Sequence, residues 1–131
     1  WSAALNVVLA SVEKQSCLPD EVIIADDGST AETRELIARL TTDFPVPLVH
    51  SWHEDKGFRL STSRNRAIRL AKHEYIIMID GDRVLHSHFV ADDLAIAEPN
   101  YLVTEKRIKM GLVRNRHARE YHRATHSHIE A

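Results

Sequence analysis

Glu21-Val-Ile-Ile-Ala-Asp-Asp-Gly-Ser29 and Tyr75-Ile-Ile-Met-Ile-Asp-Gly-Asp82 are the two stretches that decide the fold of this chain. In each of them, a short apolar run leads directly into a pair of carboxylates. Such runs of four or five residues, rich in β-branched side chains and flanked by helical pattern, predict strands buried on both faces of a parallel sheet. Ligands of open α/β sheets bind outside the carboxyl ends of the strands, so the two acidic turns predict one shared polar site.

Carboxylates that lie this close together need a cation beside them. Mg²⁺ and Mn²⁺ are hard ions that take oxygen ligands and are commonly shared with the phosphates of a substrate. The two acidic turns therefore predict a divalent cation at this edge of the sheet.

The length and the charge distribution divide the chain into a body and a tail. The chain has 131 residues, 44% of them hydrophobic, which suits one domain with a real core. Residues 1–104 carry an excess of acidic side chains, whereas residues 105–131 contain seven Lys or Arg, three Asp or Glu and four His. We therefore expect an α/β domain over 1–104, followed by a basic His/Arg-rich tail over 105–131 that forms a dangling helix or no fixed structure.

The sequence gives no sign of secretion or of a membrane span. It holds a single cysteine and no stretch that resembles a signal peptide. It also lacks an apolar run of the ~20 residues that cross a bilayer. A cytoplasmic location is the resulting expectation.

Helical patterns surround the first apolar run. A helix capped by Ser2 and ending near Cys17 is expected, with Ala4, Leu5, Val8, Leu9 and Val12 on one face. After the first acidic turn, the spacing Ser29-x-x-Glu32 predicts a capping box for a helix to about Leu40, with Leu36 and Ile37 inward.

The alternation continues to the end of the body. Residues 48–52 predict a further strand, and Ser61 to Ser63 begin a predicted helix to about Lys72 that buries Ala67, Ile68 and Ala71. A last helix is expected around Phe89 to Ala97. Strands alternating with helices predict an α/β domain with a mostly parallel sheet and right-handed crossovers.

Four motifs of this sequence, taken in order, resemble glycosyltransferase family 2. They are Leu-x-x-x-Leu-x-Ser-Val-x-x-Gln at residues 5–15, the Asp-Asp-Gly-Ser turn, Glu54-Asp-Lys-Gly-Phe-Arg59 with Arg64-Asn65-x-Ala67-Ile68, and Ile79-Asp80-Gly81-Asp82. The resemblance covers about residues 5–90. It implies a Rossmann-like GT-A fold, which is a three-layer α/β/α sandwich with a mostly parallel sheet, here in truncated form.

The resemblance also implies an activity. Members of the family transfer a hexosyl unit from a nucleotide sugar, and this chain would use a UDP-sugar donor, a carbohydrate acceptor and Mn²⁺ or Mg²⁺, with inversion at the sugar. The Asp-Lys-Gly-Phe-Arg variant looks most like members that build polysaccharides or transfer galactose or N-acetylhexosamine.

Individual residues match the family's binding positions. Asp27 matches the carboxylate that reads uracil, and the adjacent Asp26 would shape the turn within the same substrate-binding set. A carboxylate suits this task because uracil offers an N–H donor on its pairing edge, and a group made to accept it discriminates against bases that lack it. Asp82 matches the metal-binding carboxylate, and Asp80 the position that faces the ribose or reaches the metal through water.

Basic residues between the two acidic turns are the candidates for phosphate or ribose contacts. They are Lys56, Arg59 and Arg64, of which Arg64 matches the family best. Each of these assignments has a plainer alternative, because Asp-Gly turns and exposed helical arginines are also frequent structural features.

The chain departs from the family pattern at both ends. The family's first strand, which lies inside the sheet, would precede Trp1, so the strands at 22–25 and 75–79 are expected to lack their common neighbour and to expose edge hydrogen bonds. The acids after Asp82 are Asp92, Asp93, Glu98, Glu105 and Glu120. None of them matches the family's general base, so the catalytic residues remain unassigned and a truncated fragment holding the donor half is expected.

Two other functions compete with transfer. The chain could be a noncatalytic module that binds a nucleotide sugar. Alternatively, its basic tail could bind a membrane surface or nucleic acid, although nucleic acid is disfavoured because no aromatic residues are interleaved in a recognised motif. A nucleotidyltransferase is disfavoured too, since Gly28-Ser29 and Asp80 are much farther apart than such a site requires.

Overall fold

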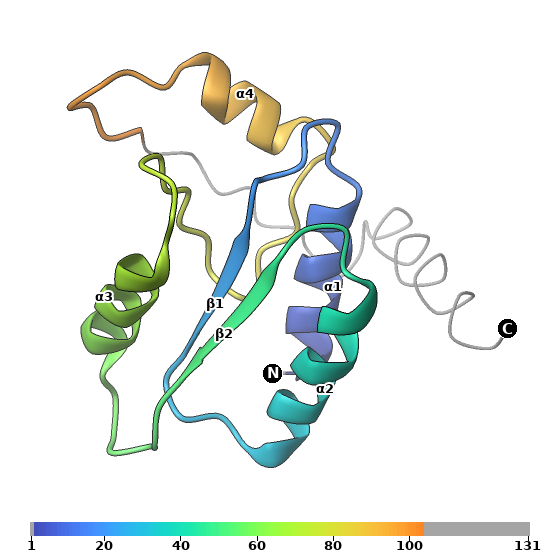
Figure 1. Ribbon diagram of the computed structural model, residues 1–131, viewed down its shortest axis with the longest axis vertical. Helices are drawn as coiled ribbons and strands as arrows, with labels where there is room; N and C mark the ends of the chain where they lie inside the picture. Colours follow the sequence, from blue (N-terminus) through green and yellow to red (C-terminus); the bar gives the residue numbers. More distant parts are fainter. Residues whose placement is uncertain (1, 104–131) are drawn as a thin grey trace, which may run out of the picture.

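Two parallel strands form the centre of the fold. In the computed structural model, which describes residues 2–103, β1 (Val22–Asp26) pairs with β2 (Leu48–Trp52). Asp26 lies opposite Trp52, so both strands end level at the lower edge in Figure 1. The strand predictions for residues 22–25 and 48–52 are confirmed.

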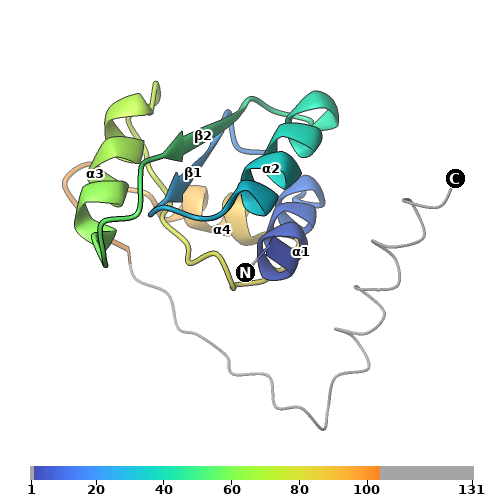
Figure 2. The ribbon, with the colours of Figure 1, turned by 90° about the horizontal axis from the view of Figure 1, so that it is seen from below.

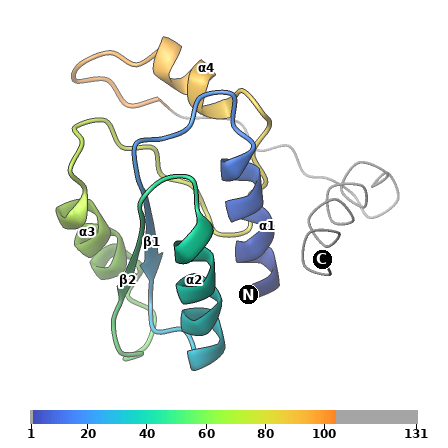
Figure 3. The same ribbon diagram turned by 45° about the vertical axis from the view of Figure 1, so that its right-hand side comes forward.

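Helices cover both faces of this small sheet. Figure 2 shows α1 (Ser2–Glu13) and α2 (Ala31–Asp43) on one face and α3 (Leu60–Leu70) on the other. The short helix α4 (Phe89–Ala95) lies at the other end of the sheet from the turn after β1 (Figure 3). The domain is therefore a mixed α/β structure with the predicted three layers, but its sheet has two strands in the described residues.

The core lies between the sheet and the helices α1 and α2. The apolar face predicted for the first helix is largely confirmed, since Leu5, Leu9 and Val12 are buried against Ile24 of β1 and Ile37 of α2. Ile37 is 1% exposed. Burying one such side chain contributes about 1.5–3 kcal/mol to stability, so this packing of α1 and α2 against the sheet is the main source of stability in the domain.

Two buried polar side chains, Ser11 of α1 and Gln15 just after the helix, attach the segment that leads into α4. The Gln15 amide donates to the carbonyl of His86 at 2.7 Å and accepts from the N–H of Val90 at 3.0 Å. The Ser11 hydroxyl accepts from the N–H of Leu85 at 3.1 Å. These contacts satisfy backbone groups that have no partner in a sheet or helix, and they explain why polar residues occupy the buried face of α1.

The third strand predicted over residues 75–79 is wrong. Ile77 and Ile79 pack against the core, whereas Ile76 and Met78 are 41% and 59% exposed, which is the alternation of a half-buried strand. The segment nevertheless forms no ladder with β1 or β2. A strand is defined by pairing with a neighbour, and no described residue fills the position between this segment and the free edge of β1.

The prediction that Ile68 is buried on the third predicted helix is also wrong. The helix itself is present as α3, but Ile68 and Leu70 are 41% and 47% exposed, and the buried residue of this helix is Ser63. A two-stranded sheet covers only part of the helix face. The apolar side chains beyond that strip therefore remain in contact with water.

The predicted capping box of the second helix does not form. Thr30 is the N-cap residue of α2 and makes no side-chain hydrogen bond there. The Ser29 hydroxyl donates instead to the carboxylate of Asp26, and Glu32 accepts from the hydroxyl of Ser2 at 2.8 Å. Hydrogen bonds to ionised groups are stronger than those between neutral groups, so the nearby carboxylate takes the hydroxyl.

The helix boundaries differ from expectation by a few residues. The first helix ends at Glu13 rather than near Cys17, and the second continues to Asp43. Within residues 2–103, no helix combines the length and apolar character that a bilayer span requires. The predicted basic tail over 105–131, including its suggested membrane contact, lies outside the described residues.

Candidate functional site

The turn after β1 is closed by the buried side chain of Asp26. Its carboxylate is 2% exposed and accepts the N–H of Ser29 at 2.8 Å, the Ser29 hydroxyl, and Nε2 of His50 at 2.7 Å from the neighbouring strand. Burial raises the pKa of Asp26, but the hydrogen bonds from Ser29 and His50 outweigh it, so the pKa lies below its ordinary value. Asp26 therefore shapes the turn, as its sequence position suggests, and its contact with a substrate stays a prediction.

The buried carboxylate makes the stability of the domain sensitive to acid. Because the pKa of folded Asp26 lies below the ordinary value of 3.8, its stabilising effect is complete above pH 3.8 and is lost as the pH falls through the folded-state pKa. The difference in free energy of unfolding between wild type and Asp26→Asn should shrink as the pH is lowered through this range. Urea denaturation at a series of pH values measures it. Asp43→Asn, which removes an exposed carboxylate at the end of α2, is the control.

Gly28 brings the turn after β1 against the loop after β2. Its φ is +91°, a conformation that residues with a side chain rarely adopt. A Cβ at this position would lie 2.5 Å from the Cα of Asp55. The two loops thus touch through backbone atoms, and only glycine permits both the φ value and the contact.

Gly28→Ala should destabilise the domain by about 2 kcal/mol or more, because the strain of a left-handed alanine is about 1–2 kcal/mol and the clash adds to it. Gly57→Ala is the matched control, since Gly57 has φ +84° but open space around its Cβ position. Chemical denaturation of both variants separates the clash from the strain. Equal losses in the two variants would show that the loops do not touch at Gly28.

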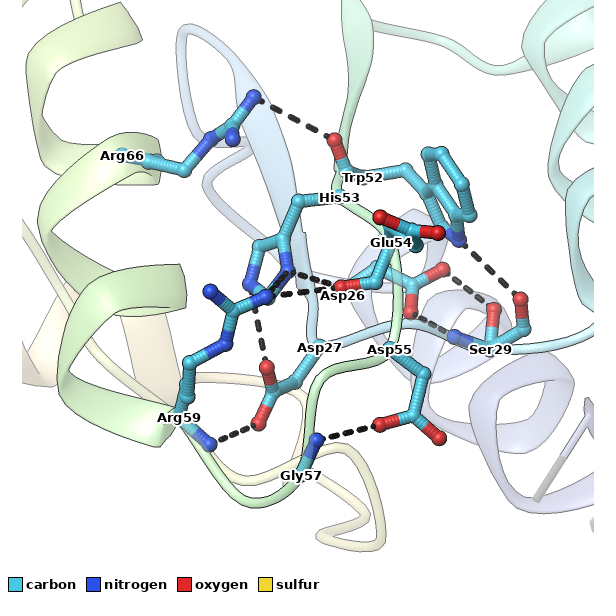
Figure 4. Close-up of polar contacts among 10 residues, drawn as sticks. All are labelled: Asp26, Asp27, Ser29, Trp52, His53, Glu54, Asp55, Gly57, Arg59 and Arg66. Atoms are coloured by element: carbon cyan, nitrogen blue, oxygen red, sulfur yellow. Dashed lines mark hydrogen bonds and ion pairs between the residues drawn. The ribbon is translucent and has the colours of Figure 1, made fainter.

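Asp27 points out of the strand and is held at both carboxylate oxygens (Figure 4). Its Oδ2 accepts the backbone N–H of Arg59 at 2.7 Å, and its Oδ1 lies 3.1 Å from Nε2 of His53. The contacts come from the loop after β2 and from the start of α3. The side chain remains 22% exposed, so it is anchored and still accessible in part.

The guanidinium of Arg59 lies behind His53 rather than in open solvent. Its Nη2 donates to the carbonyl of Glu54 at 2.8 Å and lies 3.2 Å from Nδ1 of His53. The predicted role of Arg59 in phosphate or ribose binding stays a prediction. What the structure adds is a contact chain from Arg59 through His53 to Asp27, which Figure 4 shows.

Trp52 closes the other side of the first turn. Its indole N–H donates to the carbonyl of Ser29 at 3.1 Å, and the guanidinium of Arg34 lies 4.8 Å from the ring centroid. These contacts give Trp52 a structural role in the turn after β1.

The second acidic turn contacts α3. Asp80 forms ion pairs with Arg64 and with Arg83, each at 3.5 Å. Asp82 is exposed and forms no ion pair with any residue of 2–103. The third predicted basic residue, Lys56, pairs with Glu54 at 3.2 Å on the exposed loop.

Helix α3 therefore connects the two acidic turns. Arg59, at its start, binds Asp27, and Arg64, five positions later, contacts Asp80. Five residues of α-helix rise about 7.5 Å, so the two contacts lie within reach of one ligand of nucleotide size. Of the predicted site residues, the structure brings Asp27, Arg64 and Asp80 to one helix, whereas Lys56 stands apart from them.

Comparison with known proteins shows the family of the chain. Residues 2–126 match Glycosyl transferase family 2. The chain belongs to this family. Family membership implies the GT-A fold, of which the three layers around β1 and β2 form part.

Curated family 2 relatives are distant and much longer. The chain is 31% identical over 116 residues to the hyaluronan synthase of Pasteurella multocida, covering 81% of this chain and 12% of the relative. It is 30% identical over 95 residues to the validoxylamine A glucosyltransferase of Streptomyces hygroscopicus subsp. limoneus, covering 71% and 20%. It is 33% identical over 79 residues to the chondroitin synthase of Escherichia coli, covering 60% and 11%. The chain thus spans a fifth or less of these proteins, and no solved structure matches it significantly.

The acidic residues fit the divalent cation that family 2 enzymes typically use. Among residues 2–103, no three His, Cys, Asp or Glu side chains group as a preformed metal site. Mg²⁺ is commonly held by one or two carboxylates together with substrate phosphates, so a preformed cage is not required. Asp82 offers an exposed carboxylate, while the two arginines beside Asp80 already compensate its charge.

None of the acidic residues after Asp82 is identified as the general base. Asp93 is 6% exposed and accepts the hydroxyl of Tyr75 at 2.8 Å, and Asp92 lies 4.0 Å from His86. Both belong to α4, at the other end of the sheet from the Asp27 turn (Figure 1). Glu105 and Glu120 lie outside the described residues. No catalytic base is therefore assigned.

Proposed function

We propose that this chain forms the donor site of a glycosyltransferase that moves a hexosyl unit from a UDP-sugar to a carbohydrate hydroxyl with a divalent cation. The observation that carries the proposal is the anchoring of Asp27. A partly exposed carboxylate at the carboxyl edge of a parallel sheet, hydrogen-bonded at Oδ2 by the Arg59 N–H and contacted at Oδ1 by His53, is a preformed acceptor for a ligand N–H.

The base of the donor would bind at Asp27. Uracil carries an N–H on its pairing edge, and a carboxylate accepts from it, whereas cytosine presents an acceptor at the same atom. A site built to satisfy a hydrogen bond rejects analogues that lack the partner, because its own polar group is then left unpaired. This chemistry supports UDP over CDP.

The diphosphate would bind between α3 and the second acidic turn. Arg64 supplies a positive charge there, and Asp80 keeps its guanidinium in place. Asp82, with Asp80, would hold Mg²⁺ or Mn²⁺, whose charge stabilises the departing diphosphate when it is bound. Lys56 sits on an exposed loop and would contribute its charge only at longer range.

The names of the relatives favour carbohydrate acceptors. A hyaluronan synthase and a chondroitin synthase are among the proteins that this chain resembles. We therefore extend the proposal to a polysaccharide or oligosaccharide acceptor and to inversion at the transferred sugar.

Isothermal titration of the chain with UDP, in the presence and absence of Mn²⁺ and with GDP as control, tests the donor site. We expect binding that prefers UDP and that strengthens with Mn²⁺. A folded chain that binds neither nucleotide, or both equally, would contradict the proposal. Selective UDP binding without transfer or hydrolysis of any UDP-sugar would instead identify a noncatalytic binding module.

A further inference from the structure

We propose that His53 is a positioning residue that fixes the Asp27 carboxylate and so sets the preference of the site for uracil over cytosine. The inference rests on the proposed function, because it assigns the base to Asp27. It goes beyond the motifs of the sequence, since His53 lies outside the residues matched to the family's binding positions. The surroundings of the His53 ring support this role.

The His53 ring is buried and faces the carboxylate. Its side chain is 6% exposed, although His53 follows directly after the last residue of β2 in a loop that is otherwise exposed. Nε2 of the ring lies 3.1 Å from Oδ1 of Asp27, and both atoms are shielded from solvent. Neither makes an aligned hydrogen bond with any described residue, so the contact between them is what partners both.

The Asp27 carboxylate determines that Nε2 of the His53 ring carries a proton. A carboxylate oxygen only accepts, so the approach of Nε2 to Oδ1 at 3.1 Å requires a proton on Nε2. On the far side of the ring, Nδ1 lies 3.0 Å from the carbonyl of Glu54, an acceptor, and 3.2 Å from Nη2 of Arg59, a donor, so these two contacts hold the ring without fixing the protonation of Nδ1. Arg59 is itself held by the carbonyl of Glu54 at 2.8 Å, so the ring is fixed from behind.

The two contacts leave one defined position for a ligand donor. Oδ1 of Asp27 faces His53, and one lone pair of Oδ2 accepts the Arg59 N–H. The side chain is 22% exposed while Oδ1 is shielded, so the accessible part of the carboxylate lies on the side away from His53. The second lone pair of Oδ2 is then the acceptor for the uracil N–H.

Loss of the His53 contact would affect UDP and CDP differently. With Oδ1 unpartnered, the carboxylate can turn and its aligned acceptor is lost. UDP depends on that acceptor, whereas cytosine presents a lone pair that the carboxylate repels. The ratio of the two dissociation constants therefore measures positioning, and a purely structural weakening of the loop would change both constants alike.

The test is the CDP-to-UDP ratio of dissociation constants for the full chain, measured by isothermal titration for His53→Leu and His53→Gln. Glutamine can place an amide N–H where Nε2 of histidine stands, whereas leucine cannot. We expect His53→Leu to lower the ratio by about tenfold and His53→Gln to restore most of it, because hydrogen bonds to charged acceptors are among the strong ones. His73→Leu, at an exposed histidine outside this site, is the matched control.

The outcomes separate this inference from the function on which it rests. A wild-type chain without preference for UDP would contradict the proposed function itself. A selective wild type whose ratio is unchanged in His53→Leu, or falls equally in His53→Leu and His53→Gln, would overturn the role of His53 alone. Thermal unfolding of each variant shows whether the loop still folds.

The ligand-free protein offers a second test that does not depend on nucleotide binding. Long-range ¹H–¹⁵N correlation spectra report the tautomer of each histidine. We expect Nε2 of His53 to carry a proton, because it faces the acceptor Oδ1 of Asp27. A ring protonated on Nδ1 alone in the wild type would overturn the proposed arrangement.

Discussion

Asp27→Ala should weaken UDP binding by about 10- to 100-fold, both with and without Mn²⁺, because a hydrogen bond to an ionised acceptor contributes about 1.5–3 kcal/mol. The substitution also removes the partner of the Arg59 N–H and of the His53 ring. Isothermal titration with UDP and CDP measures the loss. The variant should bind both nucleotides with similar affinity, because the group that distinguishes them is gone.

Asp20→Ala is the control for Asp27→Ala. Asp20 is an exposed acid just before β1, at the opposite end of the strand from Asp27, and its replacement by alanine removes the same charge. It should leave the UDP affinity unchanged. If Asp27→Ala retained the wild-type preference for UDP, the assignment of Asp27 to the base would be wrong.

Asp82→Ala should remove the effect of Mn²⁺ on UDP binding and leave the metal-free affinity as it is. We expect affinity in the presence of Mn²⁺ to fall by about tenfold or more, because neutralisation of phosphate charge by a metal is worth several kcal/mol. Titration of UDP at a series of Mn²⁺ concentrations measures this dependence. The two variants should differ, since Asp82→Ala loses metal dependence whereas Asp27→Ala loses base recognition.

Glu74→Ala provides the control for Asp82→Ala, because it removes an exposed acid just before the 75–79 segment. The response to Mn²⁺ should then match that of the wild type. Equal loss of metal dependence in Asp27→Ala and Asp82→Ala would contradict the separate roles that we assign to these residues.

The neighbouring residues Asp26 and Asp27 have the same side chain but different surroundings. Asp26 is the last residue of β1 and faces Ser29 and His50, where it is buried. Asp27 follows the strand, contacts the loop after β2 and remains partly exposed. Because the lowered pKa of Asp26 depends on those buried partners, it reports on turn closure rather than on ligand binding.

The elements that the sequence predicted correctly are those whose signals are local. The apolar runs that form β1 and β2, and the apolar face of α1, depend on side chains a few positions apart. The shared site expected for the two acidic turns stays a prediction, because residues 75–79 form no strand; Arg59 and Arg64 contact Asp27 and Asp80, respectively. Family membership was likewise contained in the order of the four motifs, and the comparison confirms it.

Tertiary structure decided the features that depend on partners distant in the chain. The run at 75–79 has the composition of a strand, but a strand exists only through pairing, and its pattern cannot say whether a neighbour is present. The partners of the two carboxylates were hidden for the same reason, since His50 is 24 positions from Asp26 and Arg59 is 32 positions from Asp27. The available sequence signal for the His53 contact was its position just beyond β2, at the edge of the acidic turn. The sequence alone thus determined the family and the two strands, because these follow from local pattern. The anchoring of Asp27 was decided only by packing, because hydrogen bonds join whichever groups the folded chain brings within hydrogen-bonding distance of each other.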